Sequence, residues 1–145
     1  MSSARHKALF AALVVEIRRF IANSILFNQQ VAERMGIDLT DQQVLNLLEL
    51  MGQASPGELA KLTRLTTGGV TVALDRLEKA GFIRRQRNPS DRRGIIVLPI
   101  PARQRKIQKY YRSINKQLGK LFAGYKPQEL KLIHGFFKTT NNFRS

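Results

Sequence analysis

Apolar residues recur at three- and four-residue steps along much of this chain, and that spacing predicts amphipathic helices. The central predicted helix has one apolar face, made of Val70, Ala73, Leu74, Leu77 and Ala80. Thr66 or Thr67 is suited to cap its start, because a hydroxyl oxygen can accept from a free backbone amide. Gly81 follows the last periodic residue and predicts a left-handed end to this helix.

A shorter helix is predicted just before the central one. Ser55-Pro56-Gly57-Glu58 is a capping box with proline at the first helical position. About two turns fit before Thr63, with the apolar side supplied by Leu59, Ala60 and Leu62. A short helix, a tight turn and a longer helix form the helix-turn-helix pattern.

The pattern then changes to that of a β-hairpin. Phe82 to Arg87 is one expected strand, Asn88-Pro89-Ser90 begins the turn, and Gly94 to Leu98 is a β-branched return strand. We expect Gln53-Ala54 to add a short third strand.

Longer apolar helices are predicted on both sides of this central part. The N-terminal one spans residues 8–27, and a Thr40-x-x-Gln43 capping box opens the next. After the hairpin, one helix begins at Pro101 or Ala102 and another at Pro127. The apolar face of the helix in residues 8–27 consists of Leu9, Leu13, Ile17, Phe20 and Ile21. The apolar face of the helix that begins at Pro101 or Ala102 consists of Ile107, Tyr110, Tyr111, Ile114, Leu118, Leu121 and Phe122.

These faces are broader than a small domain needs to bury, so we expect them to pack against a second chain. The fold class is therefore mostly α with a small β-wing. Residues 36–100 are expected to form a winged helix-turn-helix, flanked by dimerisation helices in residues 1–35 and 101–145. The whole is expected to form one compact domain of 145 residues.

The charge of the chain indicates what kind of partner it binds. The net charge is +15 and the pI is about 11.2, which suits a nucleic acid, an anionic membrane surface or a ribosomal setting. The chain has no cysteine, which excludes disulfides and thiolate metal sites. Glu16, Arg18 and Arg19 interrupt the N-terminal apolar stretch, which argues against a membrane span.

The hairpin concentrates positive charge. Asp91 alone opposes five arginines there, namely Arg84, Arg85, Arg87, Arg92 and Arg93. Like charges on a two-stranded ribbon repel one another and destabilise it, although a charge run is usually only a solvated face. A polyanion would neutralise these charges, and the minor groove of DNA has the negative potential that suits an arginine.

The outer side of the central helix is unusually small at its N-terminal end. Thr66, Thr67, Gly68 and Thr71 lie there, although each glycine in a helix costs about 1 kcal/mol relative to alanine. Short side chains would let the helix approach base edges closely, with Arg76 further along the same side. The alternative is that Gly68 and Gly69 only loosen a turn before the helix.

Two stretches together resemble the MarR family of winged-helix transcription regulators. They are Leu74 to Ile83, which reads LDRLEKAGFI, and Asn88 to Gly94, which reads NPSDRRG. The resemblance implies that Asp91 orients Arg93 for the minor groove and that the helix from Thr66 to Ala80 reads the major groove. The chain departs from the family at Leu98-Pro99-Ile100-Pro101, which blurs the start of the next helix.

The resemblance also implies a cytoplasmic homodimer that represses transcription from a palindromic operator. Many family members release DNA when a small aromatic or anionic effector binds. Phe20, Phe27, Tyr110 and Tyr111 are candidates to line such a cavity, but core or dimer packing explains each of them better. We therefore assign no ligand residue.

An enzyme is not expected. The ten acidic residues lie scattered beside lysines and arginines, with no spacing that pairs two carboxylates. His6 lies in the N-terminal tail and His134 near an apolar face, so neither suggests a catalytic base. No metal site and no cofactor are predicted, because two histidines without cysteine give no ligand cluster.

The sequence thus predicts a regulator that binds double-stranded DNA. Thr67, Thr71 and Arg76 are expected to read or position the major groove, Arg64 and Arg85 to hold phosphates, and Arg92 and Arg93 to enter the minor groove. Thr66, Gly68 and Asp91 complete the predicted DNA-binding set. The alternatives are a non-specific architectural nucleic-acid-binding protein and, more weakly, a protein that docks on anionic membrane through its termini.

Overall fold

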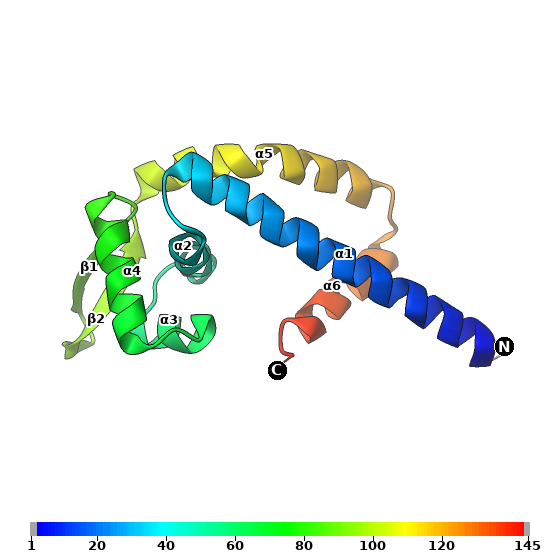
Figure 1. Ribbon diagram of the computed structural model, residues 1–145, viewed down its shortest axis with the longest axis horizontal. Coiled ribbons are helices and arrows are strands. Elements are labelled where there is room, and N and C mark those ends of the chain that lie inside the picture. Colours follow the sequence, from blue (N-terminus) through cyan, green and yellow to red (C-terminus); the bar gives the residue numbers. More distant parts are fainter. Residues whose placement is uncertain (1–2, 144–145) are drawn as a thin grey trace. The chain divides into compact units, whose positions relative to one another are not determined.

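Helices make up most of the fold, and a single hairpin interrupts them (Figure 1). The computed structural model describes residues 3–143. Its elements follow one another as α1 (Ser3–Met35), α2 (Leu39–Met51), α3 (Pro56–Thr63), α4 (Thr67–Lys79), β1 (Ile83–Asn88), β2 (Asp91–Pro99), α5 (Pro101–Ala123) and α6 (Pro127–Thr140). The expected fold class, mostly α with a small β-wing, is confirmed.

The core lies where α2, α3, α4 and the hairpin meet. The expected face of α4 is buried at four positions, Val70, Ala73, Leu74 and Leu77. These pack with buried residues of the neighbouring elements, which include Val44, Leu45, Leu48, Leu59, Ile83 and Val97. Two sequence predictions are wrong in detail. Ala80 is the exposed C-cap of α4, and Leu62 is about half exposed because it lies on the outer side of α3.

Capping hydrogen bonds fix where the short helices begin. Before α3, the Glu58 amide donates to Ser55 Oγ at 3.1 Å and the Ser55 amide donates to Glu58 Oε1 at 3.3 Å, as the capping box predicted. The expected cap of α2 at Thr40 is wrong. Asp38 is the N-cap and accepts from the Asp41 amide at 2.8 Å, so Thr40 lies in the first turn. A carboxylate there also complements the helix dipole.

Gly81 ends α4 as predicted. Its φ of +83° lies in the left-handed region, where an L side chain is strained. The Phe82 amide then donates to Leu77 O at 3.0 Å and the Gly81 amide to Glu78 O at 3.0 Å. This Schellman-type ending turns the chain directly into β1.

The hairpin is antiparallel and irregular at its tip. Arg87 pairs with Ile95, but the next residue, Asn88, pairs with Asp91. Residues 92–94 therefore bulge out of the pairing. The return strand begins at Asp91 and not at Gly94 as expected, because the two-residue turn closes at once. The expected third strand is present only as a single bridge, in which Ala54 and Val97 exchange two backbone hydrogen bonds.

The first helix is longer than expected and largely unpacked. It covers 33 residues, of which only Val31 and Ala32 are buried. Large apolar side chains stay exposed along it, including Leu9, Phe10, Leu13, Phe20, Ile21 and Leu26. No helix within residues 3–143 has the length and apolar character that crossing a membrane requires.

The chain falls into two compact units that divide between Arg105 and Lys106, within α5. The first unit contains the helix-turn-helix and the hairpin. In the second unit α6 has no buried residue, and α5 and α6 expose Ile114, Leu118, Leu121, Leu132, Phe136 and Phe137. The expected three-part division of the chain stays a prediction.

Candidate nucleic-acid interface

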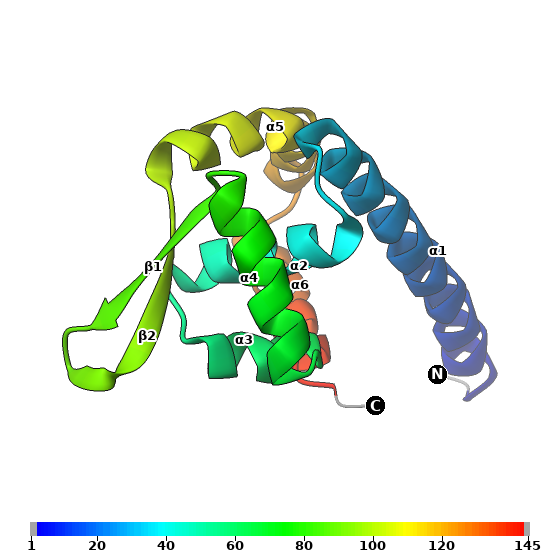
Figure 2. The same ribbon diagram turned by 60° about the vertical axis from the view of Figure 1, so that its left-hand side comes forward.

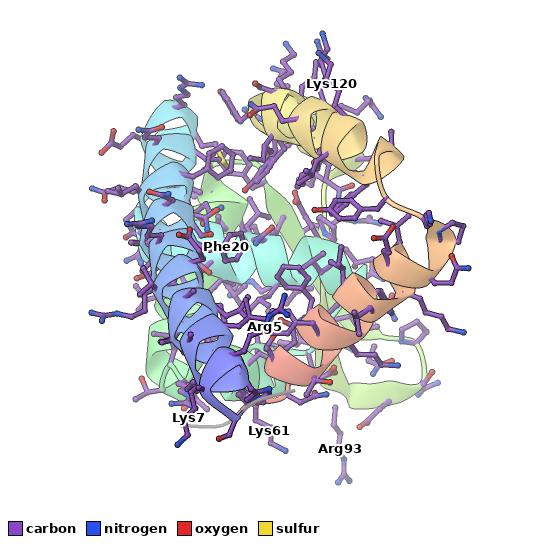
Figure 3. The ribbon with its side chains drawn as sticks, turned by 90° about the vertical axis from the view of Figure 1, so that its right-hand side faces the viewer. Arg5, Lys7, Phe20, Lys61, Arg93 and Lys120 are labelled. Carbon is purple, nitrogen blue, oxygen red and sulfur yellow. The ribbon has the colours of Figure 1, made fainter. Side chains whose placement is uncertain are left out.

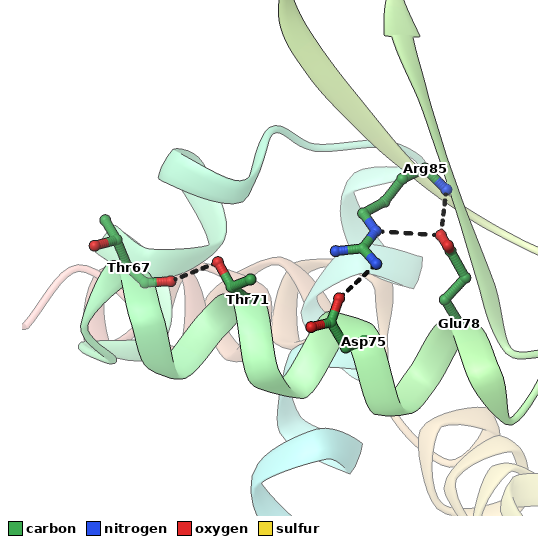
Figure 4. A network of polar contacts seen from close by, with 5 residues as sticks. All are labelled: Thr67, Thr71, Asp75, Glu78 and Arg85. Atoms are coloured by element: carbon green, nitrogen blue, oxygen red, sulfur yellow. Dashed lines mark hydrogen bonds and ion pairs between the residues drawn. The ribbon is translucent and has the colours of Figure 1, made fainter.

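The N-terminal end of α4 presents small polar groups to solvent. Thr66 caps the helix by accepting from the Gly69 amide at 3.0 Å, and Thr66, Thr67, Gly68 and Thr71 are all exposed. The Thr71 hydroxyl donates to Thr67 O at 2.9 Å, which fixes its rotamer while its methyl group and lone pairs stay accessible (Figure 4). This surface is therefore ordered and shallow, as a groove-reading helix requires.

The two glycines of α4 have different reasons to be there. A Cβ at Gly69 would lie 3.2 Å from Thr66 Oγ1 and 3.6 Å from Leu65 Cβ, so the cap itself needs this glycine. A Cβ at Gly68 would meet nothing closer than Thr66 Oγ1 at 4.0 Å. Packing within the protein thus explains Gly69 and leaves Gly68 unexplained.

Arg76 is held by acidic residues of α2. Its Nε and Nη2 donate to Asp41 Oδ2 and Oδ1, both at 2.8 Å, and Nη2 lies 3.5 Å from Asp38 Oδ2. The Asp41 side chain is 3% exposed, whereas that of Arg76 is 50% exposed. The hydrogen bonds that Arg76 donates to Asp41 raise the pKa of Arg76 further above its ordinary value. Arg76 thus joins α4 to α2, a role that the sequence did not indicate.

Arg85 ties the hairpin to α4 (Figure 4). Its Nη2 donates to Asp75 Oδ1 at 2.6 Å, its Nε to Glu78 Oε2 at 3.2 Å, and its backbone amide to the same Glu78 oxygen at 2.8 Å. The bonds to Asp75, and then those to Glu78, raise the pKa of Arg85. Two of the three guanidinium nitrogens, Nε and Nη2, donate to acidic partners, so this cluster sets the angle between the hairpin and α4.

The tip of the hairpin carries the arginines that face no acid. Asp91 Oδ1 accepts from the backbone amide of Arg93 at 3.0 Å, and this bond shapes the bulge over residues 92–94. Asp91, Arg92 and Arg93 are exposed, and within residues 3–143 neither Arg92 nor Arg93 forms an ion pair. Figure 3 shows the Arg93 side chain pointing outward from the hairpin. The resemblance implies that Asp91 orients Arg93. The hydrogen bond between the two residues comes from the Arg93 backbone amide, and the orienting role stays a prediction.

Arg64 occupies the turn between α3 and α4. It ends α3 with φ of +58°, and it is the one non-glycine residue with positive φ within residues 3–143. Its side chain is exposed. A left-handed non-glycine residue costs about 1 kcal/mol or more, so Arg64 lowers stability at this position.

Two parts of the predicted set lie toward the same side of the first unit. The hairpin leaves the C-terminal end of α4 and runs back beside it, so the tip and the N-terminal end of α4 point the same way (Figures 1 and 2). This brings the threonine surface of α4 and the tip arginines onto one side. Arg76 and Arg85 belong to α4's contacts with α2 and with β1, respectively.

Sequence reasoning missed the acidic partners of those two arginines. Asp75 and Glu78 lie three residues apart on α4 and precede the arginine-rich strand, a spacing that could have suggested a pair with Arg85. No comparable signal existed for Asp41, because 35 residues separate it from Arg76.

Among the residues whose placement the structure describes, there is a hollow but no candidate metal cluster. Residues 3–143 contain no group of His, Asp or Glu side chains that could hold a metal ion. A hollow of about 270 Å³ lies between α2 and the α3–α4 turn and is lined by Thr40, Gln43, Leu47, Leu62, Thr63 and Leu65. None of the four aromatic residues considered for an effector cavity lines it.

Comparison with known proteins shows which family the chain resembles. Residues 37–95 match the family model described as the MarR family. The chain is 36% identical over 119 residues to the HTH-type transcriptional regulator YcgE of Bacillus subtilis, a match that covers 82% of this chain and 77% of that protein. It is 37% identical over 67 residues to the multiple antibiotic resistance protein MarR of Salmonella typhimurium, which covers 46% of each chain.

Solved structures share the fold at lower identity. The apo form of wild-type MarR from E. coli superposes with a TM-score of 0.62 at 21% identity, covering 88% of this chain and 95% of that one. Overoxidized AbfR bound to DNA superposes with a TM-score of 0.55 at 19% identity, covering 96% of both chains.

Proposed function

The chain belongs to the MarR family of DNA-binding transcriptional regulators, and we propose that it acts as a homodimeric repressor that recognises a specific palindromic operator. The observation that carries this proposal is the pairing of two surfaces on one side of the first unit. These are the exposed threonine end of α4 and the bulged Arg92-Arg93 tip. With the two surfaces on one side, α4 can enter the major groove of DNA while the hairpin tip enters the adjacent minor groove.

Each predicted residue takes a role in this proposal. Thr67 and Thr71 contact base edges, Gly68 lets the backbone come close, and Arg93 enters the minor groove with Arg92 beside it. The capped helix start at Thr66 offers amides to a phosphate.

The remaining members of the set bind the backbone or hold the others in place. Arg64, in the turn before α4, contacts a phosphate. The side chains of Arg76 and Arg85 are still partly exposed, but their first role is to set the position of α4 and the hairpin. Asp91 shapes the tip.

The apolar faces that the single chain leaves exposed support the proposed dimer. Exposed leucine, isoleucine and phenylalanine side chains line α1, α5 and α6, and a second copy would cover them. Two-fold symmetry would place two α4 helices about 34 Å apart, one turn of DNA. The protein would act in the cytoplasm, where a small aromatic or anionic effector would release it from DNA.

The net charge of +15 favours one competing function, that of an architectural protein which binds any duplex. The two functions differ in what the base edges contribute to affinity. A sequence reader loses affinity on a scrambled site, whereas an architectural protein does not.

The test is a titration of labelled duplex with the wild-type protein and the Arg92→Ala/Arg93→Ala variant at several salt concentrations. If six to ten phosphates are neutralised, the slope of log K against log salt should be roughly −5 to −9. The variant should bind at least about tenfold more weakly. A double variant of exposed α1 residues, Lys7→Ala/Arg18→Ala, is the charge-matched control. Equal losses in both variants would remove the tip from the interface.

A further inference from the structure

The helix α5 has an unusual charge distribution. No Asp or Glu occurs between Asp91 and Glu129, so the whole of α5 lacks an acidic residue. Within its part in the second unit, four cations recur at steps of three or four residues, Lys109, Arg112, Lys116 and Lys120. We call these four the basic stripe. All four are exposed, and Figure 3 shows Lys120 pointing away from α5.

The basic stripe lies opposite the apolar face of the same helix. At about 100° per residue, the four cations fall within a sector of roughly 80°. The apolar residues Ile107, Ile114, Leu118 and Leu121 centre about 180° from it. A second chain that covers the apolar face would therefore leave the basic stripe open to solvent.

Nothing in the described chain neutralises this stripe. Within residues 3–143, none of the four cations forms an ion pair or a side-chain hydrogen bond. Like charges at i, i+4 destabilise a helix, and surface helices usually relieve this with interspersed Glu. The arrangement therefore loses stability in the free protein and would regain it against a polyanion.

The neighbours of the stripe decide which polyanion fits. Its flanks carry polar, uncharged groups, among them Gln108, Ser113 and Asn115, which can donate to phosphate oxygens. No aromatic residue lies within the sector, so it offers no stacking platform for single-stranded bases. No large apolar side chain lies there to insert into a lipid interface; the apolar residue that falls in the sector at the end of α5 is Ala123. A track of point charges about 16 Å long, with neutral donors beside it, suits a duplex phosphate backbone.

We propose that the basic stripe of α5 is a second, sequence-independent site for duplex DNA, separate from α4 and the hairpin. A dimer would then hold one duplex at its reading surface and contact another segment through α5. It would bridge two DNA segments. This inference goes beyond the regulator function, because binding one operator requires no second site.

The experiment is a two-colour bridging assay with the full-length protein. A random-sequence duplex is fixed to beads, protein is added, and capture of a second, fluorescent random-sequence duplex is measured across salt concentrations. Three proteins are compared: the wild type, the stripe variant Lys109→Gln/Arg112→Gln/Lys116→Gln/Lys120→Gln, and the control variant Lys7→Gln/Arg18→Gln/Lys131→Gln/Lys138→Gln. Both variants remove four exposed charges, and only one removes them from the stripe.

The proposal predicts that the wild type and the control variant capture the second duplex and that the stripe variant captures at least about tenfold less. Losing four phosphate contacts should also reduce the salt slope of capture by about 3 to 4. Equal capture by the stripe and control variants would overturn the proposal, as would no capture by the wild type. Selective loss of binding to anionic vesicles, with bridging unchanged, would overturn it in favour of a membrane.

The outcome is independent of operator recognition. Selection of a specific site in the absence of stripe-dependent bridging would leave the regulator function standing and remove the second site. Stripe-dependent bridging in the absence of a selected site would do the reverse.

Discussion

At position 68 a glycine stands where the protein leaves room for a side chain. Replacing Gly68 by alanine should raise stability by up to about 1 kcal/mol, because alanine is the better helix former and its Cβ meets no close neighbour. If the backbone of α4 approaches DNA closely there, the same methyl group should lower duplex affinity. Thermal unfolding and duplex titration measure the two effects separately.

Gly57 is the matched control for that change. It holds the same position in α3, two residues after the N-cap Ser55, and a Cβ there would meet only Ser55 Oγ at 3.9 Å. Gly57→Ala should stabilise the protein without changing affinity. If Gly68→Ala binds DNA as well as the wild type does, Gly68 has no part in the interface.

Glu49 on α2 makes stability depend on pH. Its Oε1 is buried without a hydrogen-bond partner, and burial raises the pKa of this carboxyl above its ordinary value. Since the folded pKa exceeds the unfolded one, the contribution of Glu49 to stability is fully present below the unfolded pKa of about 4.3 and is lost as pH rises through the folded pKa.

Glu49→Gln should therefore stabilise the protein at pH 7 by up to about 1 kcal/mol, or roughly 2–4 °C in Tm. The gain should shrink to nothing below about pH 4, where the wild-type carboxyl is already neutral. Thermal scans from pH 4 to pH 8 measure it, with the exposed Glu33→Gln as the control. A gain that does not vary with pH would show that ionisation of Glu49 is not its cause.

At the scale of elements, two ion-pair clusters hold α4 in place. One joins Arg76 to Asp41 of α2 and the other joins Asp75 and Glu78 to Arg85 of the hairpin. A further hydrogen bond links α2 to α1, from Gln42 Nε2 to Asn28 Oδ1 at 3.3 Å. Polar contacts thus run from α1 through α2 and α4 to the hairpin.

Asp41→Asn should lower both stability and DNA affinity, because it replaces a buried, charged bond to Arg76 by a weaker one and loosens α4. Unfolding experiments and duplex titration follow the two effects. Glu16→Gln breaks the exposed pair with Arg19 on α1 and should change neither. If Arg76 instead reads bases, freeing it from Asp41 should leave affinity unchanged or improve it.

Patterns among residues that are close in sequence predicted the helices and the hairpin well. They did not predict contacts between residues that are far apart in sequence. The Ser55 capping box, the stop at Gly81 and the buried face of α4 each depend on residues a few positions apart. Two nearby residues, Asp38 and Thr40, both fit a cap pattern, and the carboxylate at Asp38 took that position. The Arg76 bond to Asp41 required knowing how α2 packs on α4, which periodicity alone does not give.

The same limit applies to the candidate site. Five arginines identified the hairpin, but their sequence does not separate Arg85, which faces two acids, from Arg92 and Arg93, which face none. The difference comes from side-chain direction along a strand and from the bulge at the tip.

At the scale of the whole molecule, the proposed dimer would bury the apolar faces that the single chain exposes. Leu13→Glu/Ile17→Glu on the apolar face of α1 should yield monomers and abolish tight DNA binding, because charges resist burial in an apolar interface. Analytical ultracentrifugation should show the wild type at twice the 16.5 kDa chain mass and this variant at the single mass. Ala22→Glu/Gln29→Glu, on the opposite side of α1, is the control. A monomeric wild type would contradict the dimer.

The central claim is that this protein reads a DNA sequence as a dimer. Selection of bound duplexes from a random pool at about physiological salt, where non-specific binding is weak, tests it most directly. The account predicts an enriched near-palindrome whose half-sites lie one helical turn apart. The absence of any enriched sequence, despite tight binding at low salt, would contradict it and favour an architectural protein.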